Sequence, residues 1–154
     1  MSASTPPSIP TAHILGGARE QVIPREGDRD LAFKGWRLSQ VKDCQKTGGG
    51  AYIVDRCTEV SIYLTEGKTI VTHVRRWNER AGKPEDMEHL VGVHSPNDRD
   101  DEGMLLDFPG AAESAVQWLK KDNGGRLGAL SKRAWTDACS LCPELKDQEA
   151  ERVD

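Results

Sequence analysis

Cationic and indole side chains occur together twice in this chain, and both groups could bind an anionic or aromatic partner. Lysine and arginine bind phosphate groups, and an indole ring stacks on bases or on other aromatic side chains. An alternative is that the indoles anchor a sheet to its helices while the cations lie at its rim. The six candidate binding residues are Lys34, Trp36, Arg37, Arg75, Arg76 and Trp77.

The histidines offer a second kind of chemistry, but no two of them have a metal-binding spacing such as HExxH. His73 shares a strand face with Val71 and Arg75, so it could act as an acid or base in a cleft. A half-buried histidine with satisfied hydrogen bonds is the commoner outcome. The serines lack the sequence context of a nucleophile. The sequence indicates no catalytic residue, and an enzyme with a cleft around His73 stays an alternative.

Four cysteines raise the question of metal or redox chemistry. Cys139 and Cys142 form a CxxC, but Cys44 and Cys57 are too far apart in sequence to make the second pair that a structural zinc site needs. A thioredoxin-like CxxC begins a helix, whereas this one falls late in a predicted helix. Spacing i, i+3 puts both sulfurs on one helical face, as expected of core residues. We predict no metal ion and no cofactor, with a redox or metal pair as the alternative.

Charge is distributed unevenly along the chain, although the net charge is only −4. Residues 33–83 carry 10 Lys or Arg against 5 Asp or Glu, while residues 85–154 carry 8 against 16. The basic and acidic segments could attract each other within one fold. Alternatively, the basic segment forms a patch for an anionic partner.

The clearest structural signal is a β-hairpin between residues 52 and 74. Even positions from Tyr52 to Leu64 are mostly apolar and several odd positions are polar, which is the period of a half-buried strand. The β-branched run Thr69 to Val74 supplies the partner strand. Between the two runs, Gly67 offers the positive φ that a tight turn requires.

Further strands are predicted on both sides of this hairpin. Residues 31–41 form a first strand, in which the apolar phase shifts across Gly35 and indicates a bulge or a close backbone approach. Loops are expected in two polar segments, and short strands in two apolar ones. The loops are residues 43–50 and 78–88, and the short strands are residues 89–94 and 104–108.

Two helices are predicted at the C-terminal end. Pro109 suits a helix start, apolar residues then recur at helical spacing up to Lys121, and Asn123 and two glycines end the run. A second helix begins near Ser131, and Pro143 ends or restarts it. The predicted fold is therefore α+β, with an antiparallel sheet of about four to five strands from residues 31 to 108, covered on one face by two C-terminal helices.

The chain length of 154 residues fits one domain with a real core. We predict a disordered tail at residues 1–12, a single α+β domain at 13–146 and a charged tail at 147–154. The first residues lack the basic start and apolar run of a signal peptide or a membrane span. We therefore expect a soluble cytoplasmic protein that does not enter a membrane.

One family resemblance rests on short motifs. They are Phe33 to Leu38, a Tyr-containing strand, a Glu-Gly-Lys turn, a strand ending His73-Val74-Arg75-Arg76, and the end Glu151 to Asp154. In these features the chain resembles the small EXLDI family, over residues 31–77 and the very end. Val153 stands where the family name has Leu, and the final Ile is absent. The resemblance implies a fold of this kind and no particular activity.

These observations favour a small non-enzymatic binding or regulatory protein that acts through protein–protein interaction. Its surface would be the basic and aromatic sheet face or an uncovered strand edge, since strand edges pair readily with other chains. One alternative is a nucleic-acid-binding module that uses the same basic and aromatic surface. The other alternative is the small enzyme with a cleft around His73.

Overall fold

The computed structural model describes residues 16–25, 27, 29–47, 54–80, 83–121 and 124–148. The predicted tail at 1–12 lies outside these residues, and so does the predicted charged tail after Gln148. The C-terminal motif of the family resemblance, Glu151 to Asp154, lies outside them as well.

Five antiparallel strands form one sheet, in which each strand pairs with its neighbours in the chain. They are β1 (Arg19–Ile23), β2 (Leu31–Thr47), β3 (Val54–Thr65), β4 (Ile70–Arg80) and β5 (Lys83–His94). The predicted hairpin is confirmed as β3 and β4. Its turn differs in one detail, because the positive φ belongs to Lys68, at 68°, and not to Gly67.

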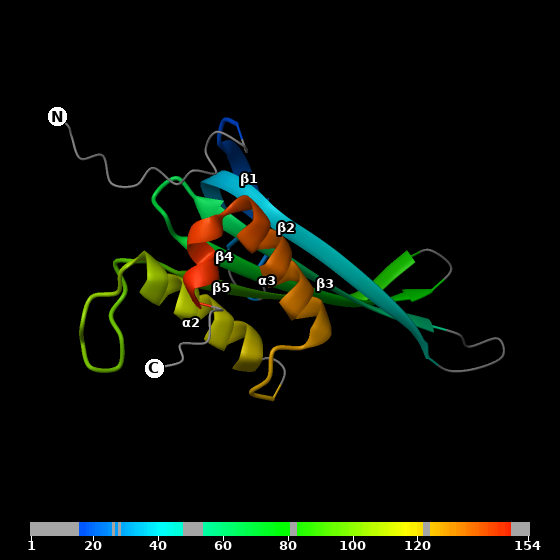
Figure 1. Ribbon diagram of the computed structural model, residues 1–154. Coiled ribbons are helices and arrows are strands. Elements are labelled where there is room, and N and C mark those ends of the chain that lie inside the picture. Colours follow the sequence, from blue (N-terminus) through cyan, green and yellow to red (C-terminus); the bar gives the residue numbers. More distant parts are fainter. Residues whose placement is uncertain are drawn as a thin grey trace.

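Two helices follow the sheet and lie together on one of its faces (Figure 1). They are α2 (Phe108–Lys121) and α3 (Ala129–Leu141), and the short 3-10 helix η2 (Pro143–Gln148) comes next. Asp107 Oδ1 accepts a hydrogen bond of 2.8 Å from the Gly110 N–H and so caps the start of α2. The predicted α+β class and the helical cover of one face are confirmed.

The main core fills the space between the sheet and these helices. Small side chains on the helices, among them Ala112, Ala115 and Ala138, let the helices pack closely on the sheet. Trp135 is fully buried at the centre, next to apolar side chains such as Val60 and Val74. Apolar burial of this extent is the main stabilising term of such a fold.

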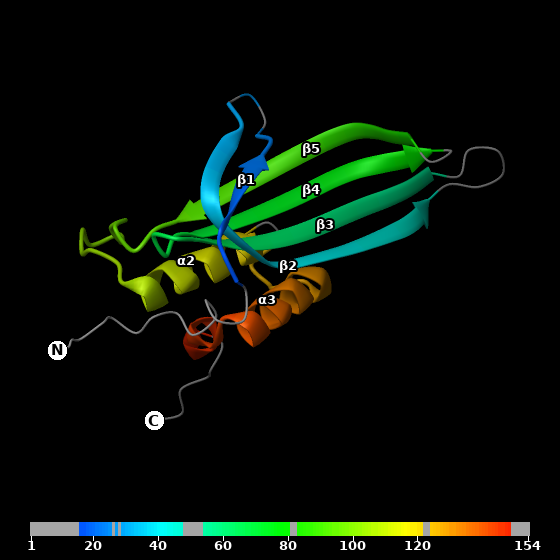
Figure 2. The ribbon, with the colours of Figure 1, turned by 90° about the horizontal axis from the view of Figure 1, so that it is seen from above.

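The first half of β2 bends across the other face of the sheet and carries β1 with it (Figure 2). The bend coincides with a register shift between Arg37 and Ser39. A second apolar cluster forms beneath this curl, made of Ile23, Leu31, Phe33, Tyr63, Val71 and Val91. Apolar clusters therefore lie on both faces of the sheet. The helices cover one face, and the curled β1–β2 segment covers the cluster on the other.

Gly35 lies where β2 turns into this curl. A Cβ atom at this position would overlap the backbone carbonyl oxygen of Leu64. The predicted close approach at Gly35 is therefore confirmed, while the irregularity in the β2–β3 pairing lies two to four residues further on.

Several predicted boundaries are wrong. Residues 43–47 and most of 78–88 continue strands instead of forming loops, and β1 was not predicted. Residues 104–108 form no strand: Leu105 makes an isolated bridge to Arg99, and α2 already begins at Phe108. The missed strand ends are polar on both faces, so they lack the apolar period by which a strand is recognised.

The sheet is longer than the helices that cover it. Strands β2 to β5 have 11 to 17 residues, and α2 and α3 have 14 and 13. A strand rises about 3.3 Å per residue and a helix about 1.5 Å, so the strands extend well beyond the helix ends. Figure 2 shows this overhang at the end of the sheet that is remote from the curl.

Candidate functional site

The helix-facing side of the sheet changes from apolar to polar where the helices end. Val41, Val60, Val74 and Leu90 lie side by side in register across β2 to β5 and belong to the core. The next row outward consists of polar residues: Asp43, Thr58, Arg76 and Glu88. A further row joins Gln45, Arg56 and Asn78. We call these seven polar residues the polar floor.

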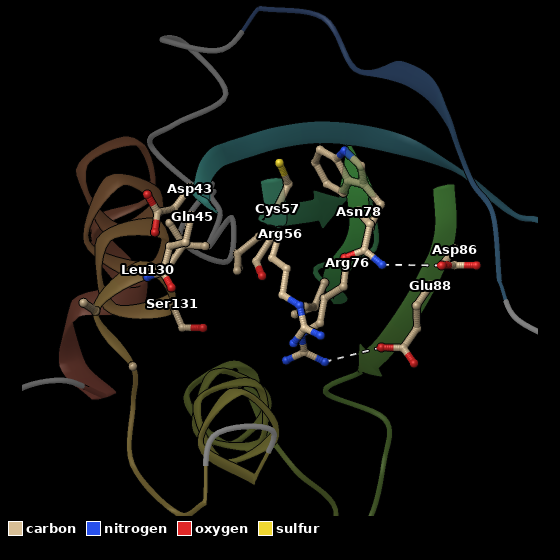
Figure 3. A pocket seen from close by; sticks show the side chains of 16 residues that line it. Asp43, Gln45, Arg56, Cys57, Arg76, Asn78, Asp86, Glu88, Leu130 and Ser131 are labelled. Carbon is tan, nitrogen blue, oxygen red and sulfur yellow. Dashed lines mark hydrogen bonds and ion pairs between the residues drawn. The ribbon is translucent and has the colours of Figure 1, made fainter. Parts of the chain in front are cut away.

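A cleft of about 640 Å³ lies over the polar floor (Figure 3). Its other wall is the start of α3, from Gly128 to Ser131, and the C-terminal end of α2 lies across from the floor in the same view. The volume is within the range of about 300–1,000 Å³ that is typical of ligand sites. The lining is mainly polar, unlike that of an ordinary gap in a core.

Two arginines of the floor point into the cleft, towards α2 (Figure 3). Arg56 on β3 pairs in register with Asn78 of β4, and Arg76 of β4 pairs with Thr58 of β3. The two arginines are thus diagonal neighbours on adjacent strands, a separation that long side chains can bridge. Their positive charges face the same space.

The two arginines differ in their contacts. Arg76 forms an ion pair of 3.5 Å with Glu88, both of them partly exposed. Arg56 is exposed, and within the described part of the chain it forms no ion pair or hydrogen bond. Asn78 Nδ2 donates a hydrogen bond of 3.4 Å to Asp86 Oδ2 at the β5 side. A guanidinium group that no described acidic side chain contacts therefore faces the cleft.

Directly behind the floor, on the opposite face of the sheet, Cys44 and Cys57 form a disulfide between β2 and β3. Cys44 lies between two residues that line the cleft, Asp43 and Gln45, and Cys57 follows Arg56. Because side chains alternate along a strand, the cross-link and the floor occupy opposite faces of the same strand segments. The sequence argument considered these cysteines only as metal ligands and missed their pairing.

Of the predicted binding residues on β4, Arg75 and Trp77 lie on the disulfide side of the sheet, and Trp77 also borders the cleft. The Arg75 guanidinium lies 4.5 Å from the Trp77 ring centre and 3.0 Å from Glu59 Oε1. Lys42 Nζ lies 5.3 Å from the same ring. Trp77 is only 6% exposed, so the cations and the sheet cover its ring. Arg76, the residue between them, points to the other face and into the cleft.

The predicted residues on β2 lie apart from those on β4, because β3 runs between the two strands. Trp36 packs against the main core, and its Nε1 donates a hydrogen bond of 3.0 Å to the Gly16 carbonyl oxygen. Lys34 and Arg37 are exposed along the curl of β2. The structure thus distributes the six predicted residues over several surfaces and does not bring them together.

His73 also lies on the disulfide side, and it does not line the cleft. Its ring stacks on that of His89, with 3.0 Å between Nε2 of His73 and Nδ1 of His89. Burial, together with the neighbouring charges of His89 and Arg75, lowers the pKa of His73 to about 4. A neutral, buried ring of this kind is suited to a structural role more than to proton transfer near pH 7.

Cys139 and Cys142 are 1% and 0% exposed and lie in the main core, as predicted. Among the residues that the structure describes, no group of three His, Cys, Asp or Glu side chains could hold a metal ion. No described helix is long and apolar enough to cross a membrane.

Of the polar floor, the sequence predicts Arg76 alone, and Arg56 and the other five residues were missed. A usable signal existed, since Arg56 and Thr58 continue the even-numbered face of the strand that carries Val60 and Ile62. A strand face that switches from apolar to polar marks the point where its cover ends.

The chain matches no family model, and no curated protein and no solved structure gives a match. The EXLDI resemblance therefore stays a prediction. The geometry of the cleft carries the functional argument.

Proposed function

We propose that this protein is a non-enzymatic binding protein that acts through protein–protein interaction, with the cleft over the polar floor as its binding site. The observation that carries this proposal is the pair Arg56 and Arg76, which points into an accessible cleft where Arg56 has no counter-charge in contact among the described residues. Like charges that face one space repel each other, and an anionic group of a partner placed between them would relieve this repulsion.

The composition of the site supports binding more than catalysis. The side chains at the cleft include amides, hydroxyls, guanidinium groups and carboxylates, which donate and accept hydrogen bonds. The histidine of the enzymatic alternative, His73, lies on the other face. The nucleic-acid alternative required exposed indoles, but Trp77 is covered and Trp36 packs on the core.

The test is to fill the cleft and measure partner capture. Thr58 lies in the middle of the floor, so Thr58→Trp would block the cleft with a large ring. Thr136 is exposed on α3, away from the cleft lining, and Thr136→Trp is the matched control. Both variants and the wild-type protein are used as bait in nuclease-treated lysate, with circular dichroism to confirm folding.

We expect a stoichiometric protein that wild type and Thr136→Trp capture and Thr58→Trp does not. Capture of the same protein by folded Thr58→Trp at wild-type level would overturn the assignment of the cleft. Single variants add a second comparison: Arg76→Ala should weaken capture and Arg75→Ala should not, because the two side chains point to opposite faces.

A further inference from the structure

We infer that the cleft recognises carboxylate side chains of an acidic segment in its protein partner, held between the guanidinium groups of Arg56 and Arg76. This inference rests on the function proposed for the cleft and names the chemistry of the partner. The planar guanidinium group matches a carboxylate with two parallel hydrogen bonds, and such charge-assisted bonds are stronger than neutral ones.

The arrangement of charges in the floor favours an anion at one particular place. Arg76 already contacts Glu88, at 3.5 Å, which shows that a carboxylate can reach this guanidinium from the β5 side. Arg56 lies on the neighbouring strand without such a partner among the described residues. A carboxylate bound between the two arginines would give the Arg56 guanidinium an ion-pair partner. It would also reduce the electrostatic repulsion between the two guanidinium groups.

The acidic residues of the cleft do not fill this place. Asp86 accepts a hydrogen bond from Asn78 at the β5 side. Asp43 lies at the α3 side, near Ser131 in Figure 3, and no ion pair joins it to either arginine in the described chain. These carboxylates disfavour a uniformly negative ligand, so a short acidic stretch fits the cleft better than a polyanion such as nucleic acid.

A peptide suits the cleft better than a small inorganic anion. The volume of about 640 Å³ is far more than one phosphate occupies. Gln45 and Asn78 lie beside Arg56 in its row, where their amides can hydrogen-bond a peptide backbone.

The experiment is a titration of the ¹⁵N-labelled full-length protein, followed by NMR through its arginine Nε–Hε signals. The probes are a capped glycine-serine hexapeptide with two central glutamates (the glutamate peptide), the same peptide with glutamines in their place (the glutamine peptide), and inorganic phosphate. Arg56→Gln and Arg76→Gln assign the two signals and measure the loss of affinity. Arg37→Gln is the matched control, because Arg37 is exposed on β2 and does not line the cleft.

We expect the glutamate peptide to shift the signals of Arg56 and Arg76 and the glutamine peptide to leave them in place. Its affinity should fall about tenfold in Arg56→Gln, as for one lost hydrogen bond to a charged group, and stay unchanged in Arg37→Gln. Equal affinity in Arg56→Gln, or shifts with phosphate alone, would overturn the inference.

The capture experiment separates this inference from the proposed function. If Thr58→Trp abolishes capture while Arg56→Gln and Arg76→Gln retain it in full, the cleft remains the binding site and the acidic partner is wrong. If Thr58→Trp has no effect, the proposed function itself is wrong.

Discussion

The imidazole ring of His94 ties the sheet to helix α2, because its Nδ1 lies 3.0 Å from the hydroxyl oxygen of Ser114. Its other nitrogen, Nε2, lies 3.1 Å from Thr72 Oγ1 on β4. The ring is 4% exposed, and burial lowers its pKa to about 4 although Asp98 raises it slightly. The link between the layers thus depends on a histidine that is neutral at pH 7.

Acid should therefore destabilise the fold already between pH 6.5 and pH 4. The pKa values of His94 and His73 are about 4 when folded and 6.5 when exposed, so the unfolded chain binds more protons between these values. The free energy of unfolding falls as the pH drops through this window, by about 2 kcal/mol for each histidine at pH 5. Urea unfolding at pH 7 and pH 5 measures the difference. His94→Gln should reduce the pH dependence, and an unchanged dependence would contradict this account.

Reduction of the disulfide between Cys44 and Cys57 should weaken the fold without abolishing it. The two cysteines are 13 residues apart, and closing a loop of this size stabilises a protein by about 3 kcal/mol. Unfolding by guanidinium chloride with and without reductant measures this term. The double variant Cys44→Ser/Cys57→Ser should behave like the reduced protein and lose its sensitivity to reductant.

The same disulfide provides a test of cellular location. Disulfides persist in oxidising compartments and are rare in the cytosol, so this cross-link is at odds with the predicted cytoplasmic location. We expect Cys44 and Cys57 to resist alkylation when thiols are trapped in intact cells that express the natural protein. Mass spectrometry of the trapped peptides gives the answer, and full labelling of both residues would favour the cytoplasm.

Trp77→Ala should destabilise the protein and weaken partner binding less than Arg76→Ala does, because Trp77 borders the cleft but its ring packs against Arg75 and Lys42. The Trp77 ring is 6% exposed, and truncation of a buried tryptophan costs about 3–5 kcal/mol. Thermal unfolding gives the loss of stability, and capture at a temperature where the variant is folded gives the binding. Specific loss of binding in the folded variant would return support to the nucleic-acid alternative.

Gly35→Ala should destabilise the curl of β2. The added methyl group would meet the backbone of Leu64, which cannot move aside as a flexible side chain does. Overpacking of this kind costs about 1–3 kcal/mol. Gly67→Ala is the control, since its nearest neighbour would be the Thr65 hydroxyl at 3.8 Å. Equal melting temperatures of the two variants would rule out the close approach.

The sequence predicts those elements whose side chains alternate between the core and the solvent. The β3–β4 hairpin and both helices carry apolar residues at the period of their element, so their type follows from the pattern. The strand ends at residues 43–47 and 78–88 extend beyond the core. They therefore lack the alternation of apolar and polar residues by which a strand is recognised. The curl of β2 depends on contacts between distant residues such as Phe33 and Tyr63, whose rings lie 5.6 Å apart.

The candidate site was harder to predict than the fold, for a related reason. Arg76 was identified by its type, but the alternation along β4 directs it away from Arg75 and Trp77. Its actual neighbour, Arg56, is 20 positions away in sequence and becomes adjacent only through the strand register. A pair of this kind is recognised only when the register between the two strands is known. A single sequence does not give that register.

The overhang of the sheet also divides the molecule into regions that should open independently. Backbone amides beneath the helices should exchange with solvent only on global unfolding, whereas hydrogen bonds in the uncovered half should break in smaller, local events. A gradient of hydrogen-exchange protection along each strand follows, steepest where Val60 gives way to Thr58. The arginine pair lies in the half with the lower opening free energy, and the covalent link between β2 and β3 limits how far that half can separate.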